Sequence, residues 1–292
     1  MQKISFWIQA SRPHTLIASI SPVVLCSILC SNYNSFSYSI FFSTLFAAIL
    51  IQIMTNFIND LYDYKKGTDR SDRLGPDRMV QNGFLKESEV KNAIILTLIC
   101  ALLIGFYLVF IGGIPILIIG CSSILFAYLY TATRFSIAYN GLGELFVFIY
   151  FGLIASIGTA YLQILKFDYN ALLIGVISGF LSISLLVVNN LRDVKSDAIS
   201  NKKTLIVIFG ENFGKVELFL SLAVPYFVLF LLSESINKTG ILYNVAPLSF
   251  FAIFLLIKST SNKSFLIHRM LPLLSLYIII FSAILGYSIY GL

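Results

Sequence analysis

Long apolar stretches alternate with short polar ones along almost the whole chain. A helix needs roughly 20 apolar residues to cross a hydrocarbon core about 30 Å thick. About nine segments approach that length, at roughly 15–31, 39–59, 92–112, 114–131, 142–162, 171–191, 217–235, 242–257 and 271–290. The pattern therefore predicts an all-α fold, a polytopic membrane helix bundle with about nine transmembrane helices. The links near Gly112 and Gly240 are tight, so the boundaries are least defined there.

The composition supports the same class. Hydrophobic residues make up 58% of the 292 residues and charged residues only 12%, whereas about a quarter of an ordinary soluble domain is charged. The four cysteines all fall in predicted spans and form no Cys-x-x-Cys pair, which is typical of packing residues rather than of a zinc site or a disulfide framework. No shift in composition divides the chain, so we expect a single domain over residues 1–292.

The basic residues predict the orientation. With the N-terminus in the cytoplasm, all of the 20 Lys and Arg residues except Lys166 and Lys238 fall on the cytoplasmic side, as the positive-inside rule requires. An odd number of spans then places the C-terminus outside, and we expect a multi-pass protein of the cell (inner) membrane. The anionic cytoplasmic leaflet accounts for the net charge of +6 without any nucleic-acid partner.

Two polar segments break the pattern of short connections, at about 60–91 and 192–217. Together they hold every aspartate of the chain except Asp168. Both follow even-numbered predicted spans, so we expect both to be loops on the cytoplasmic face.

Each segment opens with a pair of aspartates. Asp60 and Asp63 are three residues apart, and Asp193 and Asp197 are four apart. If the preceding helices continue through them, each pair lies on one helical face. Each pair also stands at a helix C-terminus, where the helix dipole is already negative. A bound cation should compensate this charge.

Magnesium is the cation that these side chains suit best, because Asp and Asn supply the oxygen ligands it prefers and it commonly shares its shell with phosphates. His14 and His268 are far apart in the sequence and offer no zinc cluster. Basic residues follow both aspartate pairs, namely Lys65, Lys66, Arg70, Arg73, Arg78, Lys202 and Lys203. Such bases can hold a diphosphate by charge-assisted hydrogen bonds. We therefore predict a metal–diphosphate site. An ordinary solvated loop better explains the outlying acids Asp72, Asp77, Glu87 and Glu89.

The strings "NDLYD" and "RDVKSD" resemble the paired aspartate motifs of the intramembrane aromatic prenyltransferase superfamily. Four longer blocks are similar, more particularly, to the 1,4-dihydroxy-2-naphthoate polyprenyltransferases of menaquinone synthesis. They are "SRPHTLIASISPVVL" (11–25), "NDLYDYKKGTDRSDRLGPDRMVQNG" (59–83), "YNGLGELFVFIYFG" (139–152) and "VVNNLRDVKSDAISNKKTLIVIFG" (187–210). The resemblance implies a nine-helix bundle whose active site opens to the cytoplasm.

The resemblance also implies roles for individual residues. The first metal-binding motif corresponds to Asp60 and Asp63, with Asn56 and Asn59 beside them, and the second to Asp193 and Asp197; these four aspartates are the expected catalytic centre, and Asn190 and Asp69 are further candidate ligands. Arg78, Arg134 and Lys203 match basic positions of the family that bind the diphosphate. Lys65 and Lys202 are further candidates for diphosphate binding because they lie beside the aspartates in the sequence. Two departures from the family pattern matter. Gly67 stands where the superfamily often has a third aspartate, which leaves the role of Asp69 open, and the usual Gly-Pro after Tyr130-Thr131 is absent, which weakens the match at Arg134.

The function that the resemblance implies is transfer of a polyprenyl chain from its diphosphate to 1,4-dihydroxy-2-naphthoate. Two Mg²⁺ ions would clamp the diphosphate, and the aromatic acid would lose CO₂ to give demethylmenaquinone. The nearest alternative is a prenyltransferase for another ring, such as 4-hydroxybenzoate. A cation-coupled transporter is a less favoured alternative. Transporters place their carboxylates near the bilayer midplane, whereas these aspartates stand at helix ends.

Four further residues are candidates for contact with the aromatic or prenyl group, namely Arg12, Asn56, Tyr130 and Glu144. Arg12 could bind the carboxylate of the acceptor. Glu144 opens the fifth predicted span, and an acid near membrane depth is a functional candidate by default. It could contact the acceptor or neutralise Arg134.

Overall fold

A computed structural model describes residues 2–33, 36–67, 75, 78–261 and 263–291. Within these residues the fold is helical and contains no β-strand. The helices are α1 (Gln2–Ser11), α2 (Pro13–Ser31), α3 (Tyr38–Lys65), α4 (Glu87–Leu129), α5 (Gly143–Val147), the π-helix η2 (Phe148–Ile154), α6 (Ala155–Ile164), α7 (Tyr169–Ile199), α8 (Leu205–Phe209), α9 (Glu211–Ser235), α10 (Gly240–Val245), α11 (Leu248–Ser261), α12 (Lys263–His268) and α13 (Met270–Gly291). A short 3-10 turn, η1 (Ile137–Tyr139), precedes α5. The prediction of an all-α bundle is confirmed.

In the described part of the chain, seven helical segments are long and apolar enough to cross a membrane. They are α2, α3, α4, the continuous run from α5 to α6, α7, α9 and α13. This agrees with a multi-pass membrane protein. The expected number of nine differs from this count at two places, α4 and the α10–α11 segment.

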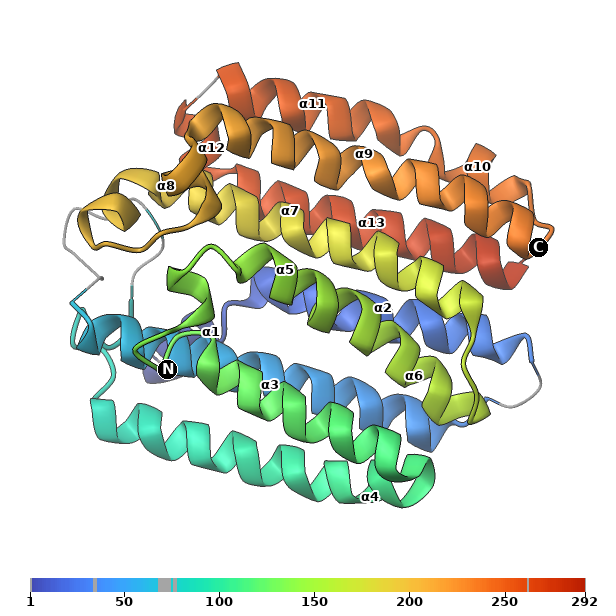
Figure 1. The fold of residues 1–292 in the computed structure, drawn as a ribbon, viewed down its shortest axis with the longest axis horizontal. Helices are drawn as coiled ribbons and strands as arrows, with labels where there is room; N and C mark the ends of the chain where they lie inside the picture. The colour runs from blue at the N-terminus through green and yellow to red at the C-terminus, as the bar shows by residue number, and fades with distance from the viewer. Residues whose placement is uncertain (1, 34–35, 68–74, 76–77, 262, 292) are drawn as a thin grey trace.

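The first difference lies in α4, whose 43 residues would extend about 65 Å as one straight helix, twice the hydrocarbon thickness. The backbone of Gly113 is not helical, with φ 64° and ψ −150°, and the chain turns back at this end of α4 (Figure 1). A side chain at Gly112 would collide with Ile116, because a Cβ there would lie 2.2 Å from its Cγ1. The two glycines therefore split α4 into two arms, at the link that the sequence marked as tight.

The second difference lies between α10 and α11. A single span was expected at 242–257, but α10 ends at Val245 and α11 begins at Leu248. Pro247 stands between them and has no backbone N–H to continue the helix. With 14 residues, α11 is shorter than a helix that spans the bilayer unaided. The number of crossings thus stays a prediction, whereas the helical segments themselves are as described.

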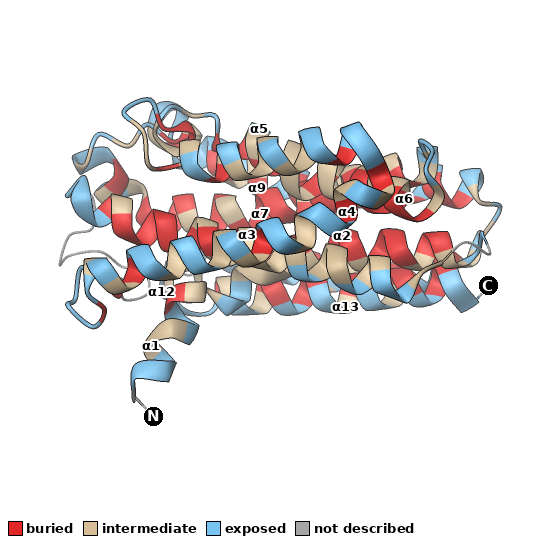
Figure 2. Cartoon of the chain, turned by 90° about the horizontal axis from the view of Figure 1, so that it is seen from below, coloured by how far each residue is buried: buried red, intermediate tan, exposed pale blue. Residues whose placement is uncertain are grey.

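The core is built around α7. Buried apolar residues of α7 pack with those of α2, α9 and α13 in one cluster, and η2 packs against α7 where glycines face each other. A Cβ on Gly152 would lie 2.6 Å from the carbonyl oxygen of Gly175, so the two backbones approach this closely only because a side chain is absent. Exposed residues lie along the outer helices of the bundle (Figure 2). Many of the exposed side chains are large and apolar, such as Phe110, which is 90% exposed. Such a surface suits a lipid solvent.

The ends of α3 and α7 that carry the aspartates lie at the same end of the bundle, beside α1 and α8 (Figure 1). The chain ends at the opposite end of the bundle, where α13 terminates. Both helices run on into the segments expected as loops, since α3 ends at Lys65 and α7 at Ile199. The condition stated for each aspartate pair, that its helix continues through it, is therefore met.

Candidate active site at the aspartate-bearing helix ends

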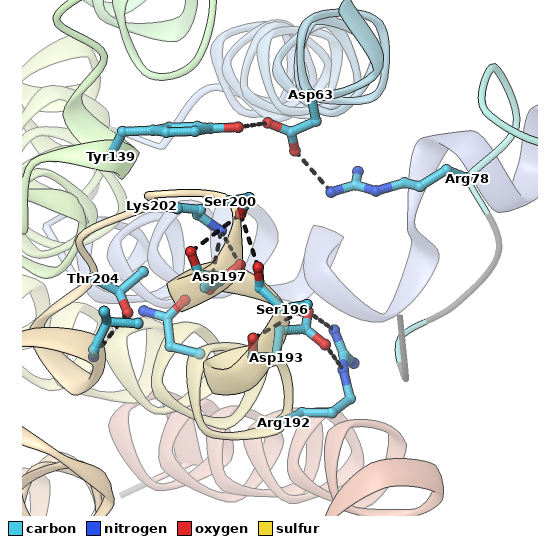
Figure 3. A network of polar contacts seen from close by, with 12 residues as sticks. Asp63, Arg78, Tyr139, Arg192, Asp193, Ser196, Asp197, Ser200, Lys202 and Thr204 are labelled. Atoms are coloured by element: carbon cyan, nitrogen blue, oxygen red, sulfur yellow. Dashed lines mark hydrogen bonds and ion pairs between the residues drawn. The ribbon is translucent and has the colours of Figure 1, made fainter. Parts of the chain in front are cut away.

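The first carboxylate cluster, Asp60 and Asp63, projects from the last turns of α3 and is buried. Arg78 supplies its counter-charge: its Nη2 donates to Asp63 Oδ2 at 2.8 Å, and its Nη1 lies 3.9 Å from Asp60 Oδ1. Tyr139 donates its hydroxyl to Asp63 Oδ1 at 2.8 Å (Figure 3). The backbone N–H of Val80 donates to Asp60 Oδ2 at 3.2 Å. All of these partners come from outside α3.

The second carboxylate cluster, Asp193 and Asp197, lies on the last turns of α7 and is also buried. The guanidinium of Arg192 donates to both carboxylate oxygens of Asp193, with Nε 2.9 Å from Oδ1 and Nη2 2.8 Å from Oδ2. Lys202 lies beside Asp197, with Nζ 3.3 Å and 3.4 Å from its two oxygens (Figure 3). Both partners are close neighbours in the sequence.

Three asparagines beside the clusters are held by hydrogen bonds of their own. Asn59 Oδ1 accepts from the hydroxyl of Thr131. Asn190 donates through Nδ2 to Glu144 Oε1 at 2.9 Å. This bond leaves the side-chain amide oxygen of Asn190 for another partner. Asn56 donates through Nδ2 to the carbonyl oxygen of Ser11 at 2.8 Å.

A polar cavity of about 480 Å³ lies between the two clusters. Its walls come from the α1–α2 junction, α3, the segment after residue 78, the α4–α5 link and α7. Eleven of the predicted residues line it, namely Arg12, Asn56, Asn59, Asp60, Asp63, Arg78, Tyr130, Glu144, Asn190, Asp193 and Lys202. The fold therefore gathers around one space residues that are far apart in the sequence.

A second cavity, of about 420 Å³, adjoins the first and has mostly apolar walls from α2, α3, both arms of α4, η2 and α6. The two cavities share Gln52, Thr55, Tyr130, Val147 and Phe151 as walls. The apolar cavity therefore adjoins the polar one. Along α3, it lies farther from the aspartates than the polar cavity does.

Several predicted residues lie away from the polar cavity. Asp197 is buried beside Lys202 but does not line the space. Lys65, Arg134 and Lys203 have exposed side chains and also do not line it. Asp69 lies outside the described residues.

The possible pairing of Glu144 with Arg134 is not what the structure shows. Glu144 accepts from Asn190, whereas Arg134 lies exposed with its guanidinium carbon 6.0 Å from the ring centre of Phe135.

Sequence reasoning missed two residues at the site, Arg192 and Tyr139. Arg192 directly precedes Asp193, and this adjacency was the available signal. Tyr139 lies in the block "YNGLGELFVFIYFG", but nothing in its spacing indicated Asp63 as its partner.

Lys66, counted only as one base among many, donates from Nζ to the carbonyl oxygens of Thr131 and Thr133 at 2.6 Å and 2.8 Å. Burial lowers the pKa of Lys66, while the nearby Asp63 opposes this shift. Lys66 therefore connects the end of α3 to the α4–α5 link and does not line the polar cavity.

The donor set can be tested for its fit to a metal ion. Within the described residues, no group of three or more His, Cys, Asp or Glu side chains converges to hold one ion. Each cluster instead offers two buried carboxylates, with an asparagine nearby. Such a set suits Mg²⁺, which keeps water or phosphate oxygens in much of its shell. The residues therefore fit the predicted ion, provided that a ligand completes its coordination.

Comparison with known proteins decides the family, since residues 19–265 match the UbiA prenyltransferase family. The chain belongs to this family. The 1,4-dihydroxy-2-naphthoate octaprenyltransferase of Haemophilus influenzae is 32% identical over 255 residues, which cover 84% of this chain and 83% of that protein. The Escherichia coli protein of the same name is 34% identical over 70% of this chain and 68% of its own length. The resemblance found in the four sequence blocks is confirmed.

Solved structures of UbiA homologues share the fold. The apo structure of a UbiA homologue from Aeropyrum pernix K1 superimposes with a TM-score of 0.70 at 12% identity, over 96% of this chain and 98% of that one. A UbiA homologue from Archaeoglobus fulgidus, bound to GPP and Mg²⁺, gives a TM-score of 0.67 at 14% identity, over 98% and 100%. The whole bundle, and not only the aspartate-bearing half, therefore has the UbiA architecture.

Proposed function

We propose that this UbiA-family chain transfers a polyprenyl group from polyprenyl diphosphate to 1,4-dihydroxy-2-naphthoate with loss of CO₂ and diphosphate, giving the quinol form of demethylmenaquinone. The observation that carries the proposal is the polar cavity flanked by two carboxylate clusters and continued by an apolar cavity. A diphosphate with a long hydrocarbon tail has this division of polarity. The relatives named for this activity, at 30–35% identity, support the choice of acceptor.

Asp60 and Asp63, with Asn59, would hold one Mg²⁺, and Asp193 and Asp197, with Asn190, a second. Asp69 is a further candidate ligand. Bound Mg²⁺ would neutralise charge on the diphosphate and so make it a better leaving group. That a distant structural homologue is bound to GPP and Mg²⁺ supports this choice of ion and substrate class.

The basic residues would bind the diphosphate oxygens directly. Arg78 and Lys202 line the cavity and are the nearest candidates. Lys65, Arg134 and Lys203 are exposed and do not line it, and we assign them to capture of the diphosphate as it approaches. Fixed cations of this kind help most when charge accumulates on the departing group.

The apolar cavity would hold the first part of the prenyl chain. The walls that it shares with the polar cavity are Gln52 and Thr55 of α3, together with the larger side chains of Tyr130, Val147 and Phe151. Apolar walls at this point exclude water from the allylic carbon as its bond to oxygen breaks. The Tyr130 ring would also face this carbon, where an aromatic face stabilises positive charge.

The acceptor would lie in the polar cavity beside Arg12, Asn56 and Glu144. Arg12 is the candidate partner for the ring carboxylate, and Glu144 for a ring hydroxyl. The ring carbon that carries the carboxylate attacks the allylic carbon, and the bond to the carboxyl carbon then breaks. Its electron pair returns to the ring as CO₂ leaves, so no ring hydrogen has to be removed.

The setting of this reaction follows from the sequence. We propose a single domain in the cell membrane, with the N-terminus and the aspartate-bearing helix ends in the cytoplasm and the C-terminus outside. Both water-soluble substrate groups would then enter from the cytoplasm, and the tail would stay within the bilayer.

A product assay on the purified chain in detergent tests the proposal. The mixture contains Mg²⁺, a polyprenyl diphosphate and carboxyl-labelled 1,4-dihydroxy-2-naphthoate. We expect metal-dependent release of labelled CO₂ with a prenylated quinol, and loss of both products in Asp60→Ala and Asp193→Ala. Product from 4-hydroxybenzoate alone would keep the metal site and change the acceptor. No product with any acceptor, from folded protein, would overturn the enzyme assignment, and ion flux into proteoliposomes would then support a transporter.

A further inference from the structure

Arg192 is the most deeply buried cation at the site. Its side chain is 4% exposed, compared with 11% for Arg78 and 21% for Lys202. It lines the polar cavity together with Asp193. Both of the nitrogens that hold Asp193 do so at less than 3 Å, which is the two-pronged geometry of a strong arginine–carboxylate pair.

This pairing conflicts with a metal ion on Asp193. A guanidinium does not lose its proton in a protein, and a buried charge requires a partner. If a divalent cation takes the oxygens of Asp193, Arg192 loses its partner and faces two added positive charges. Metal binding at this cluster is therefore disfavoured for as long as Arg192 has no other anion to contact.

A diphosphate is the anion that resolves the conflict. The arginine fork fits phosphate oxygens as well as it fits a carboxylate. Because Arg192 and Asp193 line the same cavity, the guanidinium can reach a ligand there without leaving α7. We propose that Arg192 exchanges Asp193 for a diphosphate oxygen when the metal binds, so that Mg²⁺ and the prenyl diphosphate bind as a coupled pair.

The coupling is reciprocal by thermodynamic necessity. Arg192 lowers the affinity for Mg²⁺ alone and raises the affinity for diphosphate once Mg²⁺ is present. Removing the guanidinium should therefore move these two affinities in opposite directions. A residue that only stabilised the fold would weaken both affinities or neither.

The inference rests on the proposed metal–diphosphate site, and the test separates the two. Calorimetry on the full chain in detergent, without any acceptor, would measure binding of Mg²⁺ alone, of Mg²⁺ with farnesyl diphosphate, and of farnesyl diphosphate at saturating Mg²⁺. In Arg192→Leu we expect Mg²⁺ alone to bind about tenfold more tightly and farnesyl diphosphate about tenfold more weakly. Arg269→Leu, an exposed arginine away from the cavity, is the matched control and should change neither affinity.

Arg192→Lys keeps the charge but loses the fork, so it should shift both affinities in the same directions by a smaller factor. This variant decides the question if Arg192→Leu does not fold. Equal weakening of both affinities, or no change in either, would overturn the exchange. A native chain that binds neither Mg²⁺ nor farnesyl diphosphate would instead overturn the proposed function.

Discussion

The carboxylates on α3 and those on α7 obtain their counter-charges from different parts of the chain. Arg78, which lies beyond the end of α3, supplies one positive charge beside both Asp60 and Asp63, and Asp63 also accepts from Tyr139 of the α4–α5 link. Asp193 and Asp197 are neutralised by Arg192 and Lys202, which are close to them in the sequence. The first cluster therefore depends on tertiary contacts, whereas the second is largely assembled by α7 and the turn that follows it.

The largest expected effect concerns what the two clusters share. Asp60→Asn and Asp193→Asn keep the volume of the side chain but remove the charge that would hold a metal. We expect each to lower kcat by about 10³-fold or more, as loss of metal-based charge stabilisation does. The prenylated product is measured under saturating substrates, with thermal unfolding as a check of the fold. If one of the two variants keeps activity within tenfold, the clusters are not equivalent in catalysis.

The next effect tests the dependence of the first cluster on a distant cation. Arg78→Met should raise the KM for the prenyl diphosphate and lower kcat/KM by about 10²-fold, because a nearly buried charge-assisted contact and a direct phosphate partner are both lost. Steady-state kinetics with varied polyprenyl diphosphate would measure this. Lys258→Met, which changes an exposed residue of α11, is the control. An unchanged KM would mean that Arg78 serves only to hold Asp63.

A smaller effect is expected at the corresponding lysine of the second cluster. The contact of Lys202 with Asp197 is longer, at 3.3 Å, and more exposed, and such pairs contribute little. Lys202→Met should therefore lower kcat/KM by about tenfold, through the diphosphate rather than through Asp197. The same kinetic series reports it. A loss of kcat/KM as large as that of Arg78→Met would mean that the two cations contribute equally at their clusters.

The smallest effect separates a hydrogen bond from a charge. Tyr139→Phe removes only the hydroxyl that donates to Asp63 Oδ1, and one such bond contributes about 1 kcal/mol. We expect about a fivefold loss of kcat, measured with the same product assay. Tyr128→Phe is the control, because its hydroxyl contacts that of Tyr62 and not a carboxylate. Equal losses in the two variants would contradict a role of Tyr139 through Asp63.

The same comparison explains what could be predicted from the sequence. The apolar segments and the aspartate spacing follow from local rules, so the helices and both clusters were predictable. Lys202 was a candidate because it lies five residues from Asp197, within reach of a helix end. Asp63 and Tyr139 are 76 residues apart, and no periodicity connects them.

The break in α4 and the one before α11 show the same limit in the fold. The Gly112–Gly113 pair gives a local signal for a turn, and the boundary was predicted there. The interruption at Pro247 lies inside a continuous apolar run, where hydrophobicity alone does not distinguish one helix from two. The pairing of Asn190 with Glu144 likewise depends on how α7 and α5 pack, which the sequence does not state.

The π-helix Phe148–Ile154 has a consequence for the direction of the side chains on either side of it. A π-helical turn contains a surplus residue compared with an α-helical one, and each residue of an α-helix turns the chain by about 100°. Within the continuous run from α5 to α6, the segment therefore changes the direction in which the following side chains point around the helix axis. Before it, Glu144 faces the polar cavity; after it, Gly158 and Leu162 face the apolar one. Deleting Ile149, which lines neither cavity, would rotate α5 against α6 by about 100° and turn Glu144 away from Asn190, although every side chain named at the site would still be present.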